Sequence, residues 1–242
     1  MSEPTSLQIF AVEGLGEVAP GAALSALLAE VLGAEAGEFG LKDGDVLVVT
    51  QKVVSKAEGR VVPLDHDDEE AKIALVEAES VRVLRRRGSL LITETTHGFV
   101  CANAGVDLSN ALDGTAVLLP LEPDRSARRL RADLGRALGV DVAVIVSDTF
   151  GRTWRNGVTD IALGCAGILP VLDLRGTTDA MGRELVATEV CIVDELCAAA
   201  DLVMGKASGT PAAVIRGVDP QWFAEGSVAE HVVRRAEDDL FR

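Results

Sequence analysis

The chain has 242 residues, of which 48% are hydrophobic and 25% are charged, and its formal net charge is −15. This balance is typical of a globular protein with a sizeable core and excludes an intrinsically disordered chain. The acidic surplus also argues against sequence-independent nucleic-acid binding, which needs a cationic surface.

The first residues and the cysteines indicate the cellular compartment in which the protein is expected. The first five residues contain no basic region, so they do not resemble a signal peptide, and no apolar run of about 18 residues predicts a membrane span. Cys101, Cys165, Cys191 and Cys197 lie in apolar stretches without a CxxC pair, so we expect them to be reduced core residues. We therefore expect a cytoplasmic protein.

A glycine-rich turn follows the first predicted strand, Leu7 to Val12. Residues Gly14 to Ala19 match the G-x-G-x-x-A dinucleotide fingerprint, and apolar spacing over Leu24 to Leu32 predicts a helix behind it. Pro20 lies where the helix of the fingerprint should already be running, and no acidic residue ends a second strand about 20 residues on. The turn is therefore either a weak dinucleotide motif or a backbone cradle for some other phosphate.

A basic segment follows the next predicted strand, Val46 to Thr50. Lys52, Lys56 and Arg60 recur at four-residue intervals, either as a solvated edge or as a phosphate-facing cluster. Further on, the pattern from Asp67 to Arg87 predicts one long helix with an acidic start and a basic end. Its buried stripe is expected to be Ile73, Val76, Val83 and Leu84.

Short strands and a polar loop occupy the middle of the chain. Strands are predicted at Leu90 to Thr93, Gly98 to Cys101 and Ala116 to Leu119. The loop between the last two carries Asp107, which is either part of a plain Asx turn or one carboxylate of a divalent-metal site.

A second polar stretch follows a predicted helix that ends at Gly139 and a buried strand at residues 142–146. We expect a loop from Ser147 to Asp160, where a carboxylate, a hydroxyl and two guanidinium groups suit a metal–phosphate site. These groups belong to Asp148, Thr149, Arg152 and Arg155. A loop held by structural salt bridges is the alternative.

The last third of the chain again mixes predicted strands and helices. Strands are predicted at Val171 to Leu174 and Ala212 to Arg216, and a helix from Thr188 to Val203. Loop residues Arg175 and Arg183 are candidate anion contacts. The tail, residues 219–242, is expected to hold a short helix from Val228 and to be a mobile end or a junction to another domain.

Four stretches, taken in order, resemble the coenzyme F420-0:gamma-glutamyl ligase family. They read TQKVVSKAEGR (50–60), AGVDLSN (104–110), SDTFGRTWRNG (147–157) and GKASGTP (205–211). The resemblance implies an enzyme that uses GTP to attach L-glutamate to the deazaflavin precursor F420-0 through an acyl phosphate, and then adds further gamma-linked glutamates. It also implies Mg²⁺ or Mn²⁺, with two ions expected, and K⁺ as a further candidate cofactor.

The resemblance also assigns roles to residues. It implies that Asp107, Asp148 and Thr149 are metal ligands. It implies nucleotide contacts at Leu15, Gly16, Glu17, Val18, Gln51, Lys56, Asn110, Met204, Gly205, Lys206, Ala207, Ser208, Gly209, Thr210 and Pro211. We expect Asp107 and Asp148 to be catalytic, and we add Arg152, Arg155 and Asn156 as substrate or phosphate contacts because of their chemistry.

Composition and spacing indicate mixed α and β structure, and the resemblance narrows this to an α+β, strand-rich fold in an intertwined homodimer. We expect residues 1–242 to form one ligase unit, either as a single body or as two closely packed subdomains. Two other functions compete with the ligase. One is an NAD(P)-dependent oxidoreductase that uses Gly14 to Ala19, and the other is a non-catalytic domain that binds a deazaflavin or a nucleotide.

Overall fold

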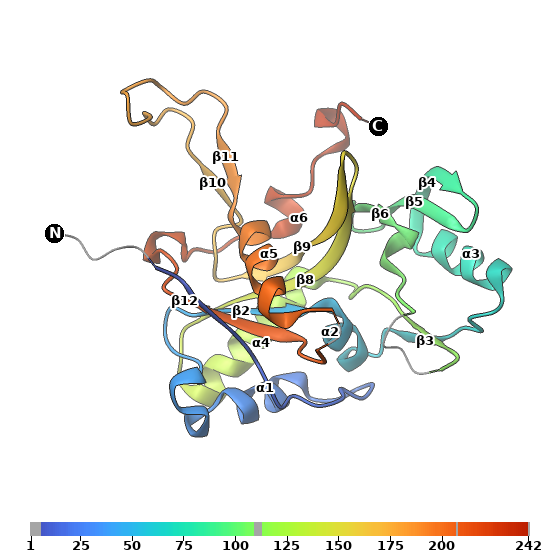
Figure 1. Ribbon diagram of the computed structural model, residues 1–242, viewed down its shortest axis with the longest axis horizontal. Coiled ribbons are helices and arrows are strands. Elements are labelled where there is room, and N and C mark those ends of the chain that lie inside the picture. The colour runs from blue at the N-terminus through green and yellow to red at the C-terminus, as the bar shows by residue number, and fades with distance from the viewer. Residues whose placement is uncertain (1–5, 109–112, 207, 242) are drawn as a thin grey trace.

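A five-stranded sheet forms the centre of the protein (Figure 1). The computed structural model describes residues 6–108, 113–206 and 208–241. In spatial order the strands of this sheet are β1 (Gln8–Ala11), β12 (Ala212–Arg216), β2 (Val46–Thr50), β8 (Ala143–Arg152) and β9 (Arg155–Ala166). Within this sheet only β2 and β8 pair in parallel, so the described residues form no regular βαβ repeat.

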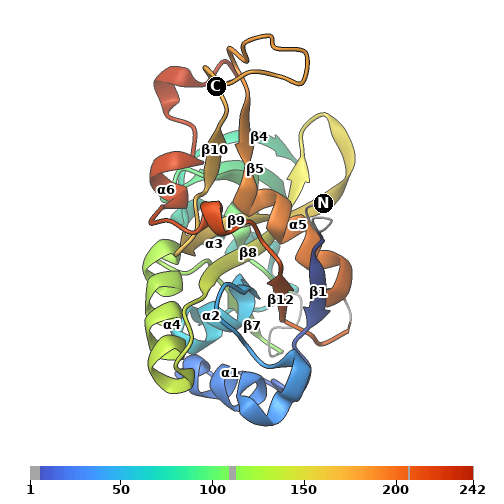
Figure 2. The ribbon, with the colours of Figure 1, turned by 90° about the vertical axis from the view of Figure 1, so that its left-hand side faces the viewer.

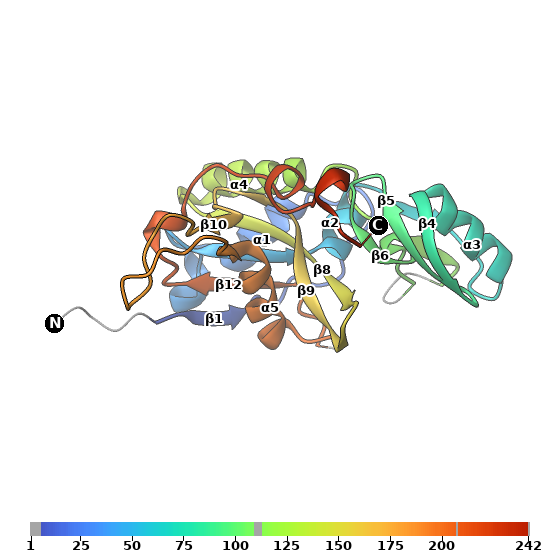
Figure 3. The ribbon, with the colours of Figure 1, turned by 90° about the horizontal axis from the view of Figure 1, so that it is seen from above.

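Helices cover both faces of this sheet. They are α1 (Leu24–Leu32), α4 (Pro123–Leu138) and α5 (Ile192–Met204). Seen from above, α4 and α5 lie on opposite sides of the strands (Figure 3), and the view in Figure 2 shows α1 and α4 close together. The alternation of β2 explains both layers: Val46 and Val48 join the core under α5, whereas Leu47 and Val49 join the core under α1 and α4.

A smaller lobe lies at one end of the main sheet (Figure 1). It contains two small sheets and one helix, with a core of its own around Val76, Leu91 and Ala104. Its elements are β3 (Val61–Pro63), α3 (Glu69–Ala78), β4 (Ser80–Arg87), β5 (Leu90–Thr95), β6 (Val100–Ala102), the 3₁₀ turn η2 (Asn103–Gly105) and β7 (Thr115–Val117). The helix α2 (Gln51–Ala57) joins this lobe to β2.

The predicted long helix over residues 67–87 is wrong. The helix ends at Ala78, and Ser80–Arg87 is a strand that pairs antiparallel with β5. The apolar residues of this segment also fit a two-residue period, and pairing with β5 decides between the two patterns. As a consequence Val83, predicted to be buried, is exposed.

Two further boundaries differ from the prediction. The stretch expected as a loop, Ser147 to Asp160, is a long hairpin in which β8 runs to Arg152 and β9 starts at Arg155. The helix expected from Thr188 starts at Ile192, because Glu189–Cys191 forms strand β11, which pairs with β10 (Val171–Asp173). Pairing with a partner strand overrides polar composition in the first case and helical apolar spacing in the second.

The remaining elements are a projecting hairpin, the C-terminal tail and short 3₁₀ segments. The hairpin of β10 and β11 projects from the body as an arm (Figure 1). The tail contains the short helix α6 (Val228–His231), as predicted, and its residues 227–229 hydrogen-bond to Asp124 of α4. Segments of 3₁₀ helix lie at η1 (Ala34–Phe39), which is kinked at Gly37, and at η3 (Pro220–Trp222) and η4 (Ala236–Asp238). None of the helices in the described residues is long and apolar enough to cross a lipid bilayer.

Candidate active site

A cleft of about 280 Å³ opens where the main sheet meets α2. It is lined by residues from four segments in which the sequence analysis had separately predicted site residues. Those residues are Gly16, Glu17 and Val18, then Lys56, then Asp148 and Thr149, and finally Met204, Gly205, Lys206, Gly209, Thr210 and Pro211. Candidate groups that are far apart in the chain therefore share one cavity.

Sheet topology explains this convergence. Thr50, the last residue of β2, pairs with Ser147 in the parallel strand β8, which continues to Arg152. Asp148 and Thr149, the next two residues of β8, therefore lie beside the start of α2, which follows Thr50 directly. Lys52 and Lys56 lie one turn apart on that helix, and both line the cleft.

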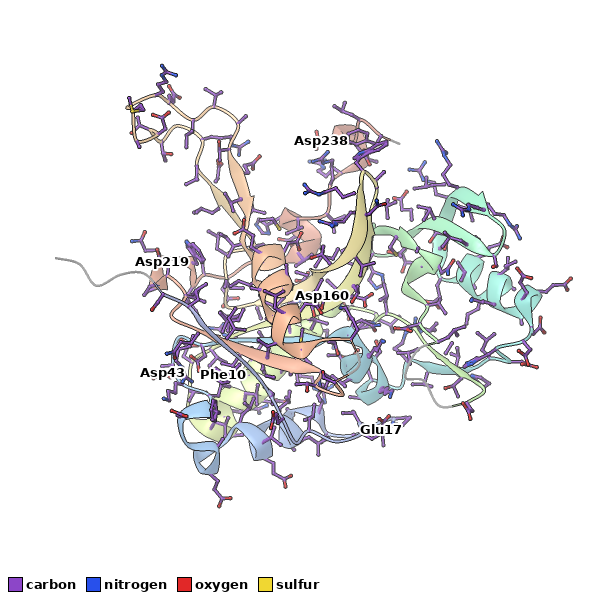
Figure 4. All side chains as sticks on the ribbon, in the orientation of Figure 1. Phe10, Glu17, Asp43, Asp160, Asp219 and Asp238 are labelled. Atoms are coloured by element: carbon purple, nitrogen blue, oxygen red, sulfur yellow. The ribbon has the colours of Figure 1, made fainter. Side chains whose placement is uncertain are left out.

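The N-terminal loop closes one side of the cleft. Leu15 and Val18 are buried in the core under α1, while Gly14 and Gly16 adopt the left-handed conformation at φ 81° and 66°. Between the two anchors, Glu17 is 73% exposed, and its Oε1 lies 2.6 Å from Nζ of Lys56, whose side chain is only 9% exposed. Figure 4 shows Glu17 at the edge of the molecule.

This loop is not a dinucleotide fingerprint. The strand before it, β1, pairs antiparallel with β12 and is not bonded to β2, so no parallel βαβ unit is formed. The helix behind the loop begins only at Leu24. The oxidoreductase alternative therefore loses its structural basis.

Asp148 is the carboxylate most affected by its surroundings. Burial raises the pKa of Asp148 to about 7, and the negative charges of Asp107 and Asp160 add to this effect. The backbone N–H of Thr149 and the charge of Lys52 act in the opposite direction. A cation bound at Asp148 would relieve this unfavourable burial of charge.

Asp107 reaches this group from the lobe. Its backbone pairs with Val117, and its Oδ2 lies 2.8 Å from Nζ of Lys52. The structure therefore brings Asp107 close enough to Asp148 for their charges to interact, with Lys52 beside them, while Asp107 itself lies outside the lining of the cleft.

A buried acidic residue, Asp160, organises the other side. It is 1% exposed and lies opposite Thr149 in the β8–β9 hairpin, near the middle of the molecule (Figure 4). Its Oδ1 accepts a 2.6 Å hydrogen bond from Thr149 Oγ1 and a 2.7 Å bond from Lys206 Nζ. Its Oδ2 accepts a 3.2 Å bond from Ser147 Oγ.

Several residues of the cleft received no role from the sequence. They are Thr50, Val53, Asp160 and Asp201. Thr50, Val53 and Asp160 belong to the stretches that carry the family resemblance or lie near them, but Asp201 lies in a helix whose pattern indicates only packing. The available signal for Asp160 was its register opposite Thr149, which depends on the hairpin that the sequence prediction missed.

Other predicted site residues lie outside the lining of the cleft. Arg152 and Arg155 are exposed at the hairpin tip, where Arg152 donates a 2.9 Å hydrogen bond to the carbonyl oxygen of Asn156. Between them, Trp154 is 80% exposed, and its ring centroid lies 6.4 Å from that of Phe241. A role of the two arginines in substrate binding stays a prediction.

The remaining candidates are placed as follows. Gln51 is fully buried and accepts a hydrogen bond from Ser55 Oγ, and its Nε2 has no partner among the described residues. Ser208 bonds to the carbonyl oxygen of Met204. Asn110 and Ala207 lie outside the described residues.

The other predicted cations pair elsewhere. Arg60 bonds to Glu79, so the expected trio of Lys52, Lys56 and Arg60 contributes only its two lysines to the cleft. On the arm, Arg175 pairs with Asp173.

The donor set suits a metal that is shared with a phosphate. In the described part of the chain, no group of three or more His, Cys, Asp or Glu side chains is arranged to hold a metal ion. Mg²⁺, however, is usually held by one or two carboxylates together with water and substrate phosphate oxygens. Asp148 with Asp107 fits that requirement, and the lysines of the cleft suit the phosphates.

The family sequence pattern described as "F420-0:Gamma-glutamyl ligase" matches residues 14–217. The chain belongs to this family. It is an enzyme of the ligase class, so the reading as a purely non-catalytic domain is set aside.

Curated relatives agree over nearly the whole chain. The coenzyme F420:L-glutamate ligase of Methanothermobacter thermautotrophicus is 41% identical, covering 98% of this chain and 99% of that protein. The enzyme of the same name from Methanopyrus kandleri is 43% identical, covering 93% and 94% of the two chains. That from Methanocaldococcus jannaschii is 38% identical, covering 85% and 87%.

Proposed function

We propose that this ligase joins L-glutamate to the deazaflavin precursor F420-0 at the expense of GTP, in a reaction that depends on Mg²⁺ or Mn²⁺. The names of the relatives support the two substrates. The observation that carries the proposal is the cleft itself, whose lining includes Asp148, Lys52, Lys56 and Lys206. Such a site can hold a polyanionic nucleotide and a divalent cation together.

The proposed chemistry has two steps. An oxygen of the terminal carboxylate of F420-0 attacks the γ-phosphorus of GTP, which gives an acyl phosphate and GDP. The glutamate amine then attacks the acyl carbon, and inorganic phosphate leaves as the amide forms and the amine loses a proton. Each further glutamate is added in the same way, through attack of its amine on the activated γ-carboxylate of the glutamate attached before it. K⁺ is proposed as an additional activator.

The residues of the chain must overcome the repulsion between a carboxylate and a triphosphate. Lys52 and Lys56 lie one turn apart on α2 and Lys206 follows α5, so two separate segments bring ammonium groups to the lining of the cleft. Asp148 and Asp107 are the groups that would hold the divalent ion. When bound, that ion supplies charge neutralisation of the phosphate oxygens.

The enzyme is further proposed to act as a homodimer, as the resemblance implies. Exposed apolar side chains support this part of the proposal, because they are costly to leave in water. They lie on the β8–β9 hairpin at Trp154 and Val158, and on the arm at Met181 and Val186. Light scattering on the purified chain tests it, with twice the mass of one chain expected and a single-chain mass contradicting it.

The activity is tested by incubating the protein with F420-0, GTP, glutamate and Mn²⁺ and analysing the products by mass spectrometry. Products heavier by successive glutamate residues are expected. Asp148→Asn should lose this activity while staying folded, whereas the matched control Asp67→Asn, on the exposed surface outside the cleft, should keep it. Untouched GTP and no gain of mass with the unmodified protein would rule the proposal out.

A further inference from the structure

The ammonium group of Lys206 uses all of its hydrogen-bond donors on the protein itself. Its Nζ lies 2.5 Å from Thr149 Oγ1, 2.7 Å from Asp160 Oδ1 and 2.7 Å from Asp201 Oδ1. A lysine ammonium has three N–H donors, and these three oxygens accept all of them. Lys206 lines the cleft, but it can donate to a phosphate there only after one of the three oxygens has been exchanged.

Burial decides which of the three oxygens can be given up. The side chain of Asp160 is only 1% exposed, so withdrawing the ammonium group would leave a buried carboxylate without its cation. The hydroxyl of Thr149 belongs to the same buried group, because it donates its proton to Asp160. The side chain of Asp201 is 23% exposed, so water can hydrate its carboxylate once Lys206 has left. Asp201 is therefore the partner that Lys206 can exchange.

The position of Asp201 in its helix points to the same pairing. Asp201 lies one turn before Met204, the last residue of α5, where the negative end of the helix dipole disfavours a carboxylate. The last turn of α5 contains no basic residue. Within residues 6–108, 113–206 and 208–241, Lys206 is the only ion-pair partner of Asp201. The pairing with Lys206, and not the stability of the helix, therefore explains an acidic residue at this place.

We infer that Asp201 competes with the nucleotide for Lys206, so that a phosphate oxygen replaces the Asp201 carboxylate at the ammonium group while Asp160 keeps its bond. This inference rests on the proposed nucleotide-dependent function and deepens it. It makes Asp201, a residue of the cleft without a role in that function, one that sets the affinity for the nucleotide. Removing its charge is then expected to tighten nucleotide binding.

Calorimetry with a non-hydrolysable GTP analogue and Mn²⁺ measures this competition in the full chain. Asp201→Asn should bind the analogue about two- to fivefold more tightly than the unmodified protein, as expected for the loss of a partly exposed ion pair. Asp201→Ala also removes the amide oxygen that could still accept from Lys206, so its gain should be at least as large. Glu195→Gln removes an exposed carboxylate from the same helix and is the matched control, with unchanged affinity expected.

A background without the lysine separates competition from the simple loss of a repelling charge. In Lys206→Ala, the change Asp201→Asn should give a clearly smaller gain than it gives when Lys206 is present. Thermal melting checks that the variants fold, and a damaged cleft would bind more weakly rather than more tightly. Unchanged or weaker binding in both folded Asp201 variants, or an equal gain without Lys206, would overturn the inference. No binding of the analogue by the unmodified protein would refute the proposed nucleotide dependence as well.

Discussion

The raised pKa of Asp148 predicts that this residue destabilises the metal-free protein as the pH rises. Burial, the first cause, favours the protonated carboxyl in the folded state and brings its pKa to about 7, compared with 3.8 for an ordinary Asp. The unfolded chain loses this proton at lower pH than the folded chain does. Between about pH 4 and 7 the folded state therefore binds more protons, and its stability falls as pH increases.

The size of the effect follows from the difference between the two pKa values. At 1.36 kcal/mol per pH unit, a difference of about three units corresponds to at most about 4 kcal/mol at pH 8. That is a large part of the roughly 5–15 kcal/mol that stabilises an ordinary domain. The penalty is absent below the unfolded pKa and fully present above the folded one.

Asp148→Asn removes the ionisable group and keeps the shape of the side chain. Urea unfolding of both proteins is measured in EDTA at pH 5 and at pH 8, and the change between the two pH values is compared. The unmodified protein should lose more stability than Asp148→Asn over this interval, by about 2–3 kcal/mol, since part of the difference has already appeared by pH 5. Equal pH dependence in the two proteins would refute the placement of Asp148 as a half-buried carboxylate close to other negative charges.

Two further predictions concern the N-terminal loop and the packing of the hairpin. Glu17→Gln should tighten binding of a GTP analogue about two- to fivefold, because it removes an ion pair with Lys56 that competes with the phosphates and is worth about 0.2–1 kcal/mol. Calorimetry should show no such gain in a Lys56→Ala background. A gain there would contradict the pairing of Glu17 with Lys56. Gly164→Ala should cost about 1–3 kcal/mol in denaturant unfolding, because a Cβ would lie 2.2 Å from the backbone carbonyl carbon of Pro123. Gly151→Ala in the same hairpin meets open space and should cost far less, so equal losses would be evidence against this packing.

Local patterns predicted the interior of the main sheet well. The apolar runs of β2, β8 and β12 and the helical spacing of α1 and α4 appear where the sequence places them. These segments are buried against neighbours of the same character, so their own periodicity is enough to identify them. The α+β class agrees with the structure, whereas the homodimer stays a prediction.

The errors arise where pairing between distant strands decides the structure. A basic, helix-compatible run became β4 because β5 pairs with it, and the polar stretch after Val146 stayed in strand conformation because β9 pairs with it. The pairing of β8 with β9 also places Asp160 beside Thr149. Asp160 was therefore overlooked for the same reason as the hairpin itself. Most of the other residues that line the cleft were predicted only through the family resemblance, because no local sequence pattern relates the N-terminal loop to the loop after α5.

The path of one oxygen atom tests the proposed ligase reaction most directly. F420-0 labelled with ¹⁸O in its terminal carboxylate is incubated with the protein, GTP, glutamate and Mn²⁺, and the released phosphate is analysed by mass spectrometry. Attack of that carboxylate on the γ-phosphorus, followed by loss of phosphate from the acyl carbon, transfers one labelled oxygen to the phosphate. Labelled phosphate, formed in step with the amide product, is the expected result. Amide formation with unlabelled phosphate would contradict the acyl-phosphate route through this cleft.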